Sequence, residues 1–192
     1  MPLGQLDDKA QRILRAAFEL AEEGGFEAVR LRDVAQRAEV ALGTLYNRFS
    51  SKEEMLVTAL DESTKTFAVL VEALESSAPT AAARVSELLV LKARALFNRP
   101  NFGRAVMRAA AGGGPEVTSR IYSHQSTISK LLLARIRGHV SGTPPTKDEA
   151  ETCHLLQQIS FACLLAWSNG MRSEDEVISD LQAAAQRLVR KD

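Results

Sequence analysis

A short polar stretch near the N-terminus carries side chains that could recognise a nucleic acid. Thr44, Asn47 and Arg48 bear hydrogen-bonding groups that suit base edges or phosphates, and the Thr44 methyl could contact thymine. Tyr46 adds an amphipathic ring whose hydroxyl could reach a phosphate oxygen, and Gly43 would let a duplex approach the backbone closely. The expected chemistry is therefore base readout combined with phosphate contact.

Two short helices would have to position these side chains. Apolar residues at helical spacing predict helices over residues 31–38 and 42–49, separated by a break at 39–40. Small Ala35 would let the two helices cross closely, and the seam between them would be filled by Val34, Val40, Leu45 and Phe49. This pattern is typical of a helix-turn-helix, whose second helix enters the major groove. By itself it also fits an ordinary pair of packed helices.

Charge alone does not favour a nucleic-acid partner. The whole chain has a formal net charge of zero, and its first 55 residues hold eight Lys and Arg against ten Asp and Glu. The distribution of the bases matters more than their number, and Arg30, Arg32, Arg48 and Lys52 could share one face. Lys52 also stands at a predicted helix start, where free N–H groups favour phosphate.

The whole chain reads as helices separated by short breakers, with no persistent strand-like alternation. The predicted helices span about residues 8–23, 31–38, 42–49, 52–75, 80–97, 101–111, 115–137, 147–169 and 174–190. Gly24-Gly25 would end the first of them, and Pro115 suits the first turn of the seventh. Ser51 with Glu54, and Ser173 with Glu176, have the spacing of capping boxes.

The run from Leu31 to Leu56 closely resembles the DNA-binding signature of the TetR family of bacterial repressors. The matching landmarks are Val34-Ala35, Ala38, Gly43-Thr44-Leu45-Tyr46, Phe49, Lys52 and Leu56. The resemblance implies an all-α, nine-helix fold with a three-helix DNA-binding domain over residues 1–55 and a helical effector-binding and dimerisation domain over 56–192. The expected contacts to double-stranded operator DNA are Arg30, Arg32, Leu42, Gly43, Thr44, Tyr46, Asn47, Arg48 and Lys52.

Three positions depart from the family pattern. The family usually has Gly in the turn, where this chain has Glu39, so a positive φ there would cost about 1 kcal/mol. Ala41 and Arg30 stand where the family often has Ser and Thr as helix caps, which are typically worth about 1 kcal/mol each. These changes weaken local stability rather than the resemblance, and Arg30 could instead add a phosphate contact.

The family resemblance also implies a small hydrophobic effector held among the later helices. The residues expected to contact it are Phe67, Val71, Phe97, Phe102, Val106, Met107, Tyr122, Phe161 and Trp167, with Leu74 and Leu91 as further candidates. Each could equally be ordinary core packing, but a buried Tyr122 hydroxyl or Trp167 indole would need a polar partner. Arg104 and Arg108 could meet an acidic ligand or simply face solvent.

A narrower likeness points to one kind of effector. The segments Ala41–Tyr46, Phe102–Ala109 and Leu164–Trp167 resemble actinobacterial repressors of sterol catabolism, which respond to steroid-type acyl-CoA molecules. The effector would act by shifting the fourth helix and changing the spacing of the two recognition helices.

The last two helices are expected to form a homodimer, at about residues 147–169 and 174–190. The first is strongly apolar from Ile159 to Trp167, with small residues at Ala162, Cys163 and Ala166. The second offers Leu181, Ala184, Ala185 and Leu188. A buried pair within one chain is the alternative.

Other classes of protein fit the sequence less well. The three histidines, His124, His139 and His154, lie on separate segments, and no metal-ligand spacing, nucleophile motif or phosphate-binding loop occurs, so we expect neither an enzyme nor a metal or other cofactor. A helical scaffold for a protein partner remains a second possibility, and DNA footprinting distinguishes it. Cys153 and Cys163 read as free thiols, and the sequence lacks a signal pattern or a long apolar run, so we expect a cytoplasmic protein without a membrane span.

Overall fold

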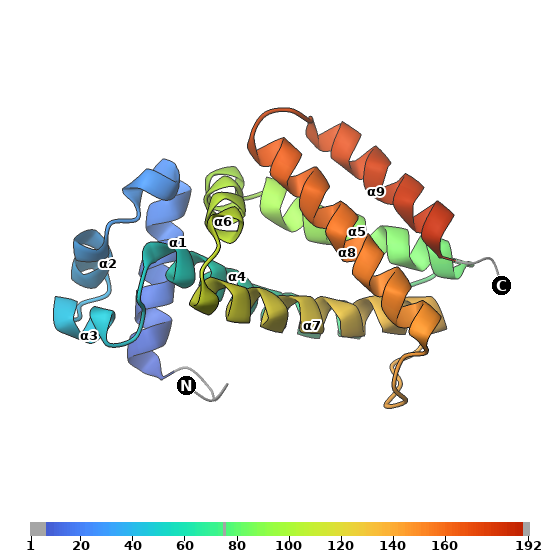
Figure 1. Cartoon of the computed structure of the whole chain (residues 1–192), viewed down its shortest axis with the longest axis horizontal. Coiled ribbons are helices and arrows are strands. Elements are labelled where there is room, and N and C mark those ends of the chain that lie inside the picture. Colours follow the sequence, from blue (N-terminus) through green and yellow to red (C-terminus); the bar gives the residue numbers. More distant parts are fainter. Residues whose placement is uncertain (1–6, 75, 190–192) are drawn as a thin grey trace. The chain divides into compact units, whose positions relative to one another are not determined.

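The computed structural model describes residues 7–74 and 76–189, and every regular element within them is an α-helix. These helices are α1 (Asp8–Ala28), α2 (Leu31–Arg37), α3 (Leu42–Tyr46), α4 (Lys52–Ala73), α5 (Ala81–Phe97), α6 (Pro100–Gly112), α7 (Pro115–Arg137), α8 (Lys147–Ser168) and α9 (Glu174–Leu188) (Figure 1). The predicted all-α class and the order of nine helices are therefore confirmed for this part of the chain. None of these helices is long and apolar enough to cross a membrane.

Hydrogen bonds at the helix starts explain where α4 and α9 begin. The Ser173 hydroxyl accepts a bond from the Glu176 N–H while the Glu176 carboxylate accepts one from the Ser173 N–H, so this predicted capping box is confirmed. At α4 only half of the predicted box forms. Ser51 Oγ accepts from the Glu54 N–H at 3.0 Å, but the Glu54 carboxylate accepts from the Ser50 N–H at 2.8 Å. The two bonds of the predicted capping box are thus divided between two residues at the start of α4, with Ser51 as the acceptor and Ser50 as the donor.

Two helix ends differ from the prediction. Gly25 leaves helical geometry with φ +70°, as expected for a helix stop, but the chain then makes one further turn and α1 extends to Ala28. α3 ends at Tyr46 instead of Phe49, although the Phe49 N–H still donates to the Leu45 carbonyl at 3.0 Å, so the chain stays coiled after the helix. The predicted ends of α4 at Glu75 and of α9 at Arg190 lie outside the described residues.

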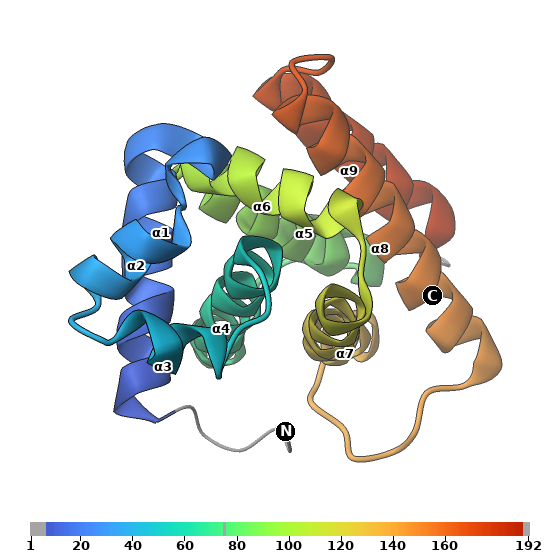
Figure 2. The same cartoon turned by 60° about the vertical axis from the view of Figure 1, so that its left-hand side comes forward.

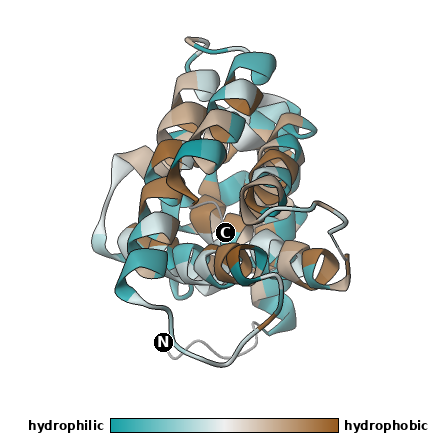
Figure 3. Ribbon diagram, turned by 90° about the vertical axis from the view of Figure 1, so that its right-hand side faces the viewer, coloured by the Kyte–Doolittle hydropathy of each residue, from teal (hydrophilic) through white to brown (hydrophobic). Residues whose placement is uncertain are grey.

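The chain divides into two compact units. Unit 1 contains the residues up to Glu62 together with Arg99–Ile121, and unit 2 contains Ser63–Asn98 and the residues from Tyr122 onward. Each of α4 and α7 therefore contributes to both units. Figure 3 shows apolar and polar residues alternating along the helices, as expected when each helix buries one face.

Unit 1 is built around α1. The apolar stripe predicted for this helix is buried, with Ile13, Ala17 and Ala21 fully inaccessible to solvent. α2 packs against α1, and α3 packs against α2. α6 also packs against α1 and crosses it, as Figure 2 shows, whereas the sequence placed it with the effector-binding helices.

The contact between α1 and α6 has specific causes. The rings of Phe18 and Phe102 pack with their centroids 4.5 Å apart. The Glu22 carboxylate accepts a bond from the Phe102 N–H at 3.0 Å, so it caps the free N–H groups at the start of α6. The Asn101 amide donates to the Glu22 carbonyl at 2.9 Å. These bonds hold the N-terminus of α6 against α1.

In unit 2, α8 and α9 form a helical hairpin that α5 supports. α9 packs against both α8 and α5, and this packing buries Val177, Leu181, Ala184 and Ala185. The prediction that Leu181, Ala184 and Ala185 form a dimer face is therefore wrong, because α5 and α8 of the same chain already cover them. Leu188 is half-buried.

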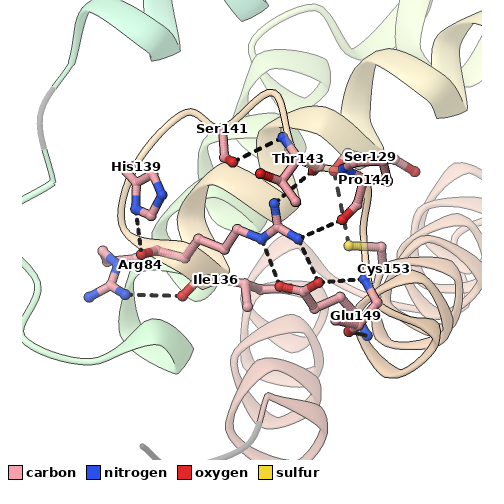
Figure 4. A network of polar contacts seen from close by, with 11 residues as sticks. Arg84, Ser129, Ile136, His139, Ser141, Thr143, Pro144, Glu149 and Cys153 are labelled. Atoms are coloured by element: carbon pink, nitrogen blue, oxygen red, sulfur yellow. Dashed lines mark hydrogen bonds and ion pairs between the residues drawn. The ribbon is translucent and has the colours of Figure 1, made fainter.

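The connection from α7 to α8 is held by two arginines (Figure 4). The Arg137 guanidinium donates to both carboxylate oxygens of Glu149, at 2.7 and 2.8 Å, and to the carbonyls of residues 143–144. Arg84 donates to the carbonyls of residues 135–136, which are otherwise free at the end of α7. The Arg137 hydrogen bond and the Thr146 N–H lower the pKa of Glu149 to about 2. These hydrogen bonds fix the predicted loop between α7 and α8 to both helices.

Candidate nucleic-acid interface and effector-binding residues

A tight turn joins α2 to α3. The Val40 N–H donates to the Ala35 carbonyl at 3.0 Å and the Glu39 N–H donates to the Gln36 carbonyl at 3.1 Å, which is the bonding pattern of a Schellman motif. The motif requires a left-handed residue, and Glu39 has φ +53°, the only positive φ of a non-glycine residue among those described. The condition under which Glu39 is expected to carry a local cost, a positive φ, is therefore met.

α3 presents a polar face and anchors itself through an apolar one. Leu45 is inaccessible to solvent and Phe49 is 2% exposed, so both fix the segment from behind. Tyr46 is 54% exposed, and Asn47 is also exposed. Gly43 is exposed as well, and nothing lies within 4 Å of where its Cβ would be. Leu42 and Thr44 are half-buried at the edge of this face. The side chains expected to read bases therefore point away from the core.

The four candidate phosphate-binding bases fall into two kinds. Arg30 and Arg32 are exposed. The Arg48 guanidinium instead lies 2.6 Å from the Asp7 carboxylate, whose pKa is lowered by the Ala10 N–H and by Arg48. Its contact to a phosphate would have to replace that ion pair.

Lys52 is also held within unit 1, by an aromatic clamp that sequence reasoning missed. Its ammonium lies 3.9 Å from the centroid of the Phe26 ring and 3.5 Å from the Glu27 carboxylate. Arg108 of α6 lies 4.2 Å from the same ring and 2.8 Å from Glu27. Lys52 and Arg108 together lower the pKa of Glu27. The Phe26 ring therefore has a cation stacked on it from α4 and another from α6.

This clamp adds to what the sequence predicted for Arg108. The sequence left it either at the mouth of an effector site or in solvent. Its side chain is 60% exposed, which agrees with the second alternative, and it also contacts Phe26 and Glu27 of α1. The sequence offered one signal for the clamp: Phe26 is an aromatic residue directly after Gly24-Gly25, in the segment that joins the first two helices.

The residues expected to contact an effector are divided between the two units. Phe102, Val106 and Met107 are buried in unit 1, and Phe102 packs on α1. The rest belong to unit 2, where Val71 is buried and Phe67 half-buried. The rings of Phe97 and Trp167, both buried there, pack with centroids 4.9 Å apart.

Several of these residues are exposed instead of buried. Tyr122 is 67% exposed, so the expectation that its hydroxyl needs a buried partner is wrong. Leu74 and Leu91 are 57% and 43% exposed, and Phe161 lies at 36% on the outer surface of α8. Helical spacing alone did not reveal which face of each helix the neighbouring helices would cover.

Sequence reasoning also missed a group of polar side chains inside unit 2. The Lys92 ammonium donates to Ser160 Oγ at 3.3 Å, which links α5 to α8. Thr64 Oγ1 and His124 Nδ1 lie 2.9 Å apart, which links α4 to α7. Lys92 is close enough to His124 to lower its pKa, after the larger effect of burial. We call these four residues the Lys92 cluster. A single lysine, threonine, histidine and serine on four helices has no sequence signature.

Comparison with known proteins agrees with this geometry. A family model described as "Bacterial regulatory proteins, tetR family" matches residues 13–59, and one described as "Tetracyclin repressor-like, C-terminal domain" matches residues 78–188. The "HTH-type transcriptional repressor KstR" of Mycolicibacterium smegmatis is 28% identical over 182 residues, which cover 95% of this chain and 87% of that protein.

Solved structures have the same fold. A TetR transcriptional regulator from Rhodococcus sp. RHA1 superposes with a TM-score of 0.83 at 26% identity, covering 95% of this chain and 96% of that one. FadR of Thermus thermophilus, solved in complex with lauroyl-CoA, gives a TM-score of 0.73 at 18% identity and covers 93% and 92% of the two chains.

The short helix pair with its exposed face on α3 defines a helix-turn-helix protein. The chain belongs to the TetR family of bacterial regulatory proteins. It is a transcriptional regulator rather than an enzyme, as the sequence predicted.

Proposed function

We propose that the chain is a repressor that binds operator DNA as a homodimer and that a small apolar or acyl-CoA-like effector releases it. Residues 1–55 would make the DNA contacts, and residues 56–192 would receive the effector and form the dimer. The observation that carries the proposal is the outward face of α3, with Tyr46 and Asn47 exposed above a buried Leu45. Repression is supported by the name of the KstR relative.

The DNA contacts follow from this face. Thr44, Tyr46 and Asn47 would meet base edges in the major groove, and Gly43, which has no side chain, would let the backbone approach. Leu42 would lie at the edge of this contact. Arg30 and Arg32 are exposed and would bind phosphates without breaking a hydrogen bond or ion pair to another described residue. On binding DNA, Arg48 would leave the Asp7 carboxylate and Lys52 the Glu27 carboxylate, and each would bind a phosphate instead. One negatively charged partner would thus replace another.

The dimer would form through the outer surface of α8, with α9 beside it. Leu155 and Phe161 are 40% and 36% exposed there, Ala162 is exposed and Ile159 half-buried. Leu155, Ile159 and Ala162 are spaced i, i+4 and i+7, so they form one apolar stripe, and Phe161 lies about 100° around the helix from Ala162. A second chain would cover the stripe together with Phe161. Two copies would then place two copies of α3 on successive half-sites of a palindrome.

The effector would act through α4, which begins in unit 1 at Lys52 and ends in unit 2 at Ala73. A ligand that prefers one position of the unit 2 end would move the Lys52 end and with it the Phe26 clamp. It must bind the DNA-incompetent state more tightly, because only differential affinity shifts an equilibrium. The lauroyl-CoA bound to the Thermus thermophilus FadR supports an acyl-CoA as the kind of ligand to test first.

The test begins by selecting bound duplexes from a random library, which supplies an operator sequence directly from the protein's own preference. Fluorescence anisotropy with that duplex should give nanomolar affinity at physiological salt. Added lauroyl-CoA and related thioesters should include one that weakens this affinity at least about tenfold. The DNA-binding proposal fails if no sequence is enriched. The switch fails if a thioester binds tightly yet leaves operator affinity unchanged.

A further inference from the structure

The Lys92 cluster lies on helix faces that are largely apolar, although Asp61 on α4 and Gln157 on α8, one turn before Thr64 and Ser160, are buried as well. One turn before and after Lys92 on α5 stand Leu88 and Leu96, which are 1% and 7% exposed. Leu156 and Leu164 occupy the same positions around Ser160 on α8, at 0% and 2%. Residues one turn apart share a helix face, so the Lys92–Ser160 bond sits within a layer of buried leucines.

The other pair of the cluster has similar surroundings. Ile128, one turn after His124 on α7, is 1% exposed, and Ala68, one turn after Thr64 on α4, is 8% exposed. Four helices thus each contribute one side chain to this polar group, and most of their buried neighbours are apolar. Packing alone would favour aliphatic residues at all four positions.

No described residue supplies a negative charge that pairs with Lys92. Lys92 makes no ion pair with a carboxylate in residues 7–74 and 76–189, and its single hydrogen bond goes to the neutral Ser160 hydroxyl. Burial lowers the pKa of Lys92 to about 8 and, with the charge of Lys92, that of His124 to about 3. His124 is therefore neutral at pH 7, and Lys92 keeps most of its charge. Lys92 and His124 are half-buried, so an ammonium is partly removed from water here without an anionic partner among the described residues, which is costly.

We propose that Lys92, Ser160 and His124 bind the carboxylate of an apolar effector acid. Lys92 has three donor hydrogens and uses one on Ser160, so two remain for carboxylate oxygens. His124 uses Nδ1 toward Thr64, which leaves Nε2 for the same ligand. The inference rests on the proposed function in that it names the chemistry of the effector's polar end.

The surroundings also suit the apolar part of such an acid. The Phe97–Trp167 pair lies five residues beyond Lys92 on α5 and seven beyond Ser160 on α8. These separations correspond to about 8 Å and about 10 Å along the two helices. A ligand held at its carboxylate end would therefore extend for several carbons before reaching the aromatic pair. Trp167 is the only tryptophan in the chain and gives a direct optical signal.

The experiment titrates the full-length protein with straight-chain carboxylates of six to sixteen carbons and follows Trp167 fluorescence. The same chains are supplied as methyl esters and as CoA thioesters. The variant is Lys92→Met, which keeps the aliphatic stem but removes the charge. The matched control is Lys130→Met, at an exposed lysine of α7 in the same unit. A second readout is the melting temperature of each variant without ligand.

We expect at least one free acid to bind saturably, its methyl ester to bind at least about tenfold more weakly, and Lys92→Met to weaken the acid by a similar factor. Lys92→Met should raise or preserve the melting temperature, whereas a purely structural lysine would lower it when removed. Lys130→Met should change neither. The proposal is overturned if no acid binds, if acid and ester bind equally, or if only thioesters bind, since the anionic group would then be the CoA phosphates.

Operator affinity separates this inference from the proposed function. Both Lys92→Met and the wild-type protein should bind the selected duplex equally without ligand. If they do and the acids fail to bind, the carboxylate site is refuted while the regulator proposal stands. If an acid binds through Lys92 but never weakens operator binding, the site stands and the proposed switch fails.

Discussion

Replacing Glu39 by glycine should stabilise the helix-turn-helix. Glu39 occupies the left-handed position of the Schellman turn after α2, with φ +53°. The chain ends α8 with the same motif, since the Met171 N–H donates to the Ala166 carbonyl and the Gly170 N–H to the Trp167 carbonyl. There the left-handed residue is glycine, at φ +73°. Two copies of one motif in one chain thus differ in whether the left-handed residue carries a Cβ.

The size of the effect follows from three contributions. A side chain in the left-handed region costs roughly 1–2 kcal/mol, which glycine removes. Glycine also gives the unfolded chain more freedom, which offsets about 0.4–1 kcal/mol. Glu39 also forms an ion pair with Arg12 at 3.9 Å, but the Glu39 side chain is 87% exposed. Loss of this ion pair should therefore change the free energy of unfolding by close to zero. The net gain is about 0.5–1 kcal/mol, or about 1–4 °C in melting temperature.

The assay combines thermal unfolding with hydrogen exchange of peptides that cover α2 and α3, because exchange reports local stability in unit 1. Glu39→Ala is the control: it removes the carboxylate but keeps a Cβ in the strained position, so it should gain little. Gly170→Glu, the converse change at α8, should destabilise by about 1 kcal/mol or more. The reasoning is refuted if Glu39→Ala gains as much as Glu39→Gly, since the charge and not the backbone would then be responsible.

Three further changes test other parts of the structure. The pKa of Glu149 is lowered to about 2 in the folded protein, so the ionised carboxylate stabilises the fold above pH 4.5. This stabilisation is lost as the pH falls toward 2. In acid titrations followed by circular dichroism, Glu149→Gln should therefore lose less stability than the wild type. Phe26→Ala should cost about 0.5–1 kcal/mol per lost cation contact in urea unfolding. It should also weaken operator binding in anisotropy, because the ring that positions the Lys52 ammonium is lost, and Phe26→Leu is the size control. Equal DNA affinity in all three proteins would contradict this role. Phe161→Glu should shift the sedimentation of the protein from dimer to monomer. Val140→Glu, at a loop residue that is 73% exposed, is the control and should leave the dimer intact. A Phe161→Glu protein that is still dimeric would place the interface elsewhere.

Much of the DNA-binding segment could be predicted because its signals are local. The spacing of Leu45 and Phe49 fixes which face of the second short helix is buried, and the face that remains carries Tyr46 and Asn47. The positive φ of Glu39 follows from the requirement of the turn, whichever residue occupies it. Such features depend on neighbours a few positions away in the sequence.

The effector-binding residues could not be predicted in the same way, because they depend on which helices meet. Apolar spacing marks Phe102 as buried but does not indicate that α1 covers it. It also does not reveal that Tyr122 faces outward, nor that Leu181 is covered by its own chain. The Lys92 cluster combines four helices, and its chemistry exists only once they are packed together.

The central claim is that the exposed face of α3 reads DNA sequence. The most direct test measures the affinity of Asn47→Ala and Tyr46→Ala for the selected operator by anisotropy, beside Gln36→Ala at an exposed position of α2 that lines a depression with Leu20 of α1. The two α3 variants should bind about 10- to 100-fold more weakly with unchanged circular dichroism, while Gln36→Ala binds like the wild type. Wild-type affinity in both α3 variants would contradict the assignment of this face to DNA.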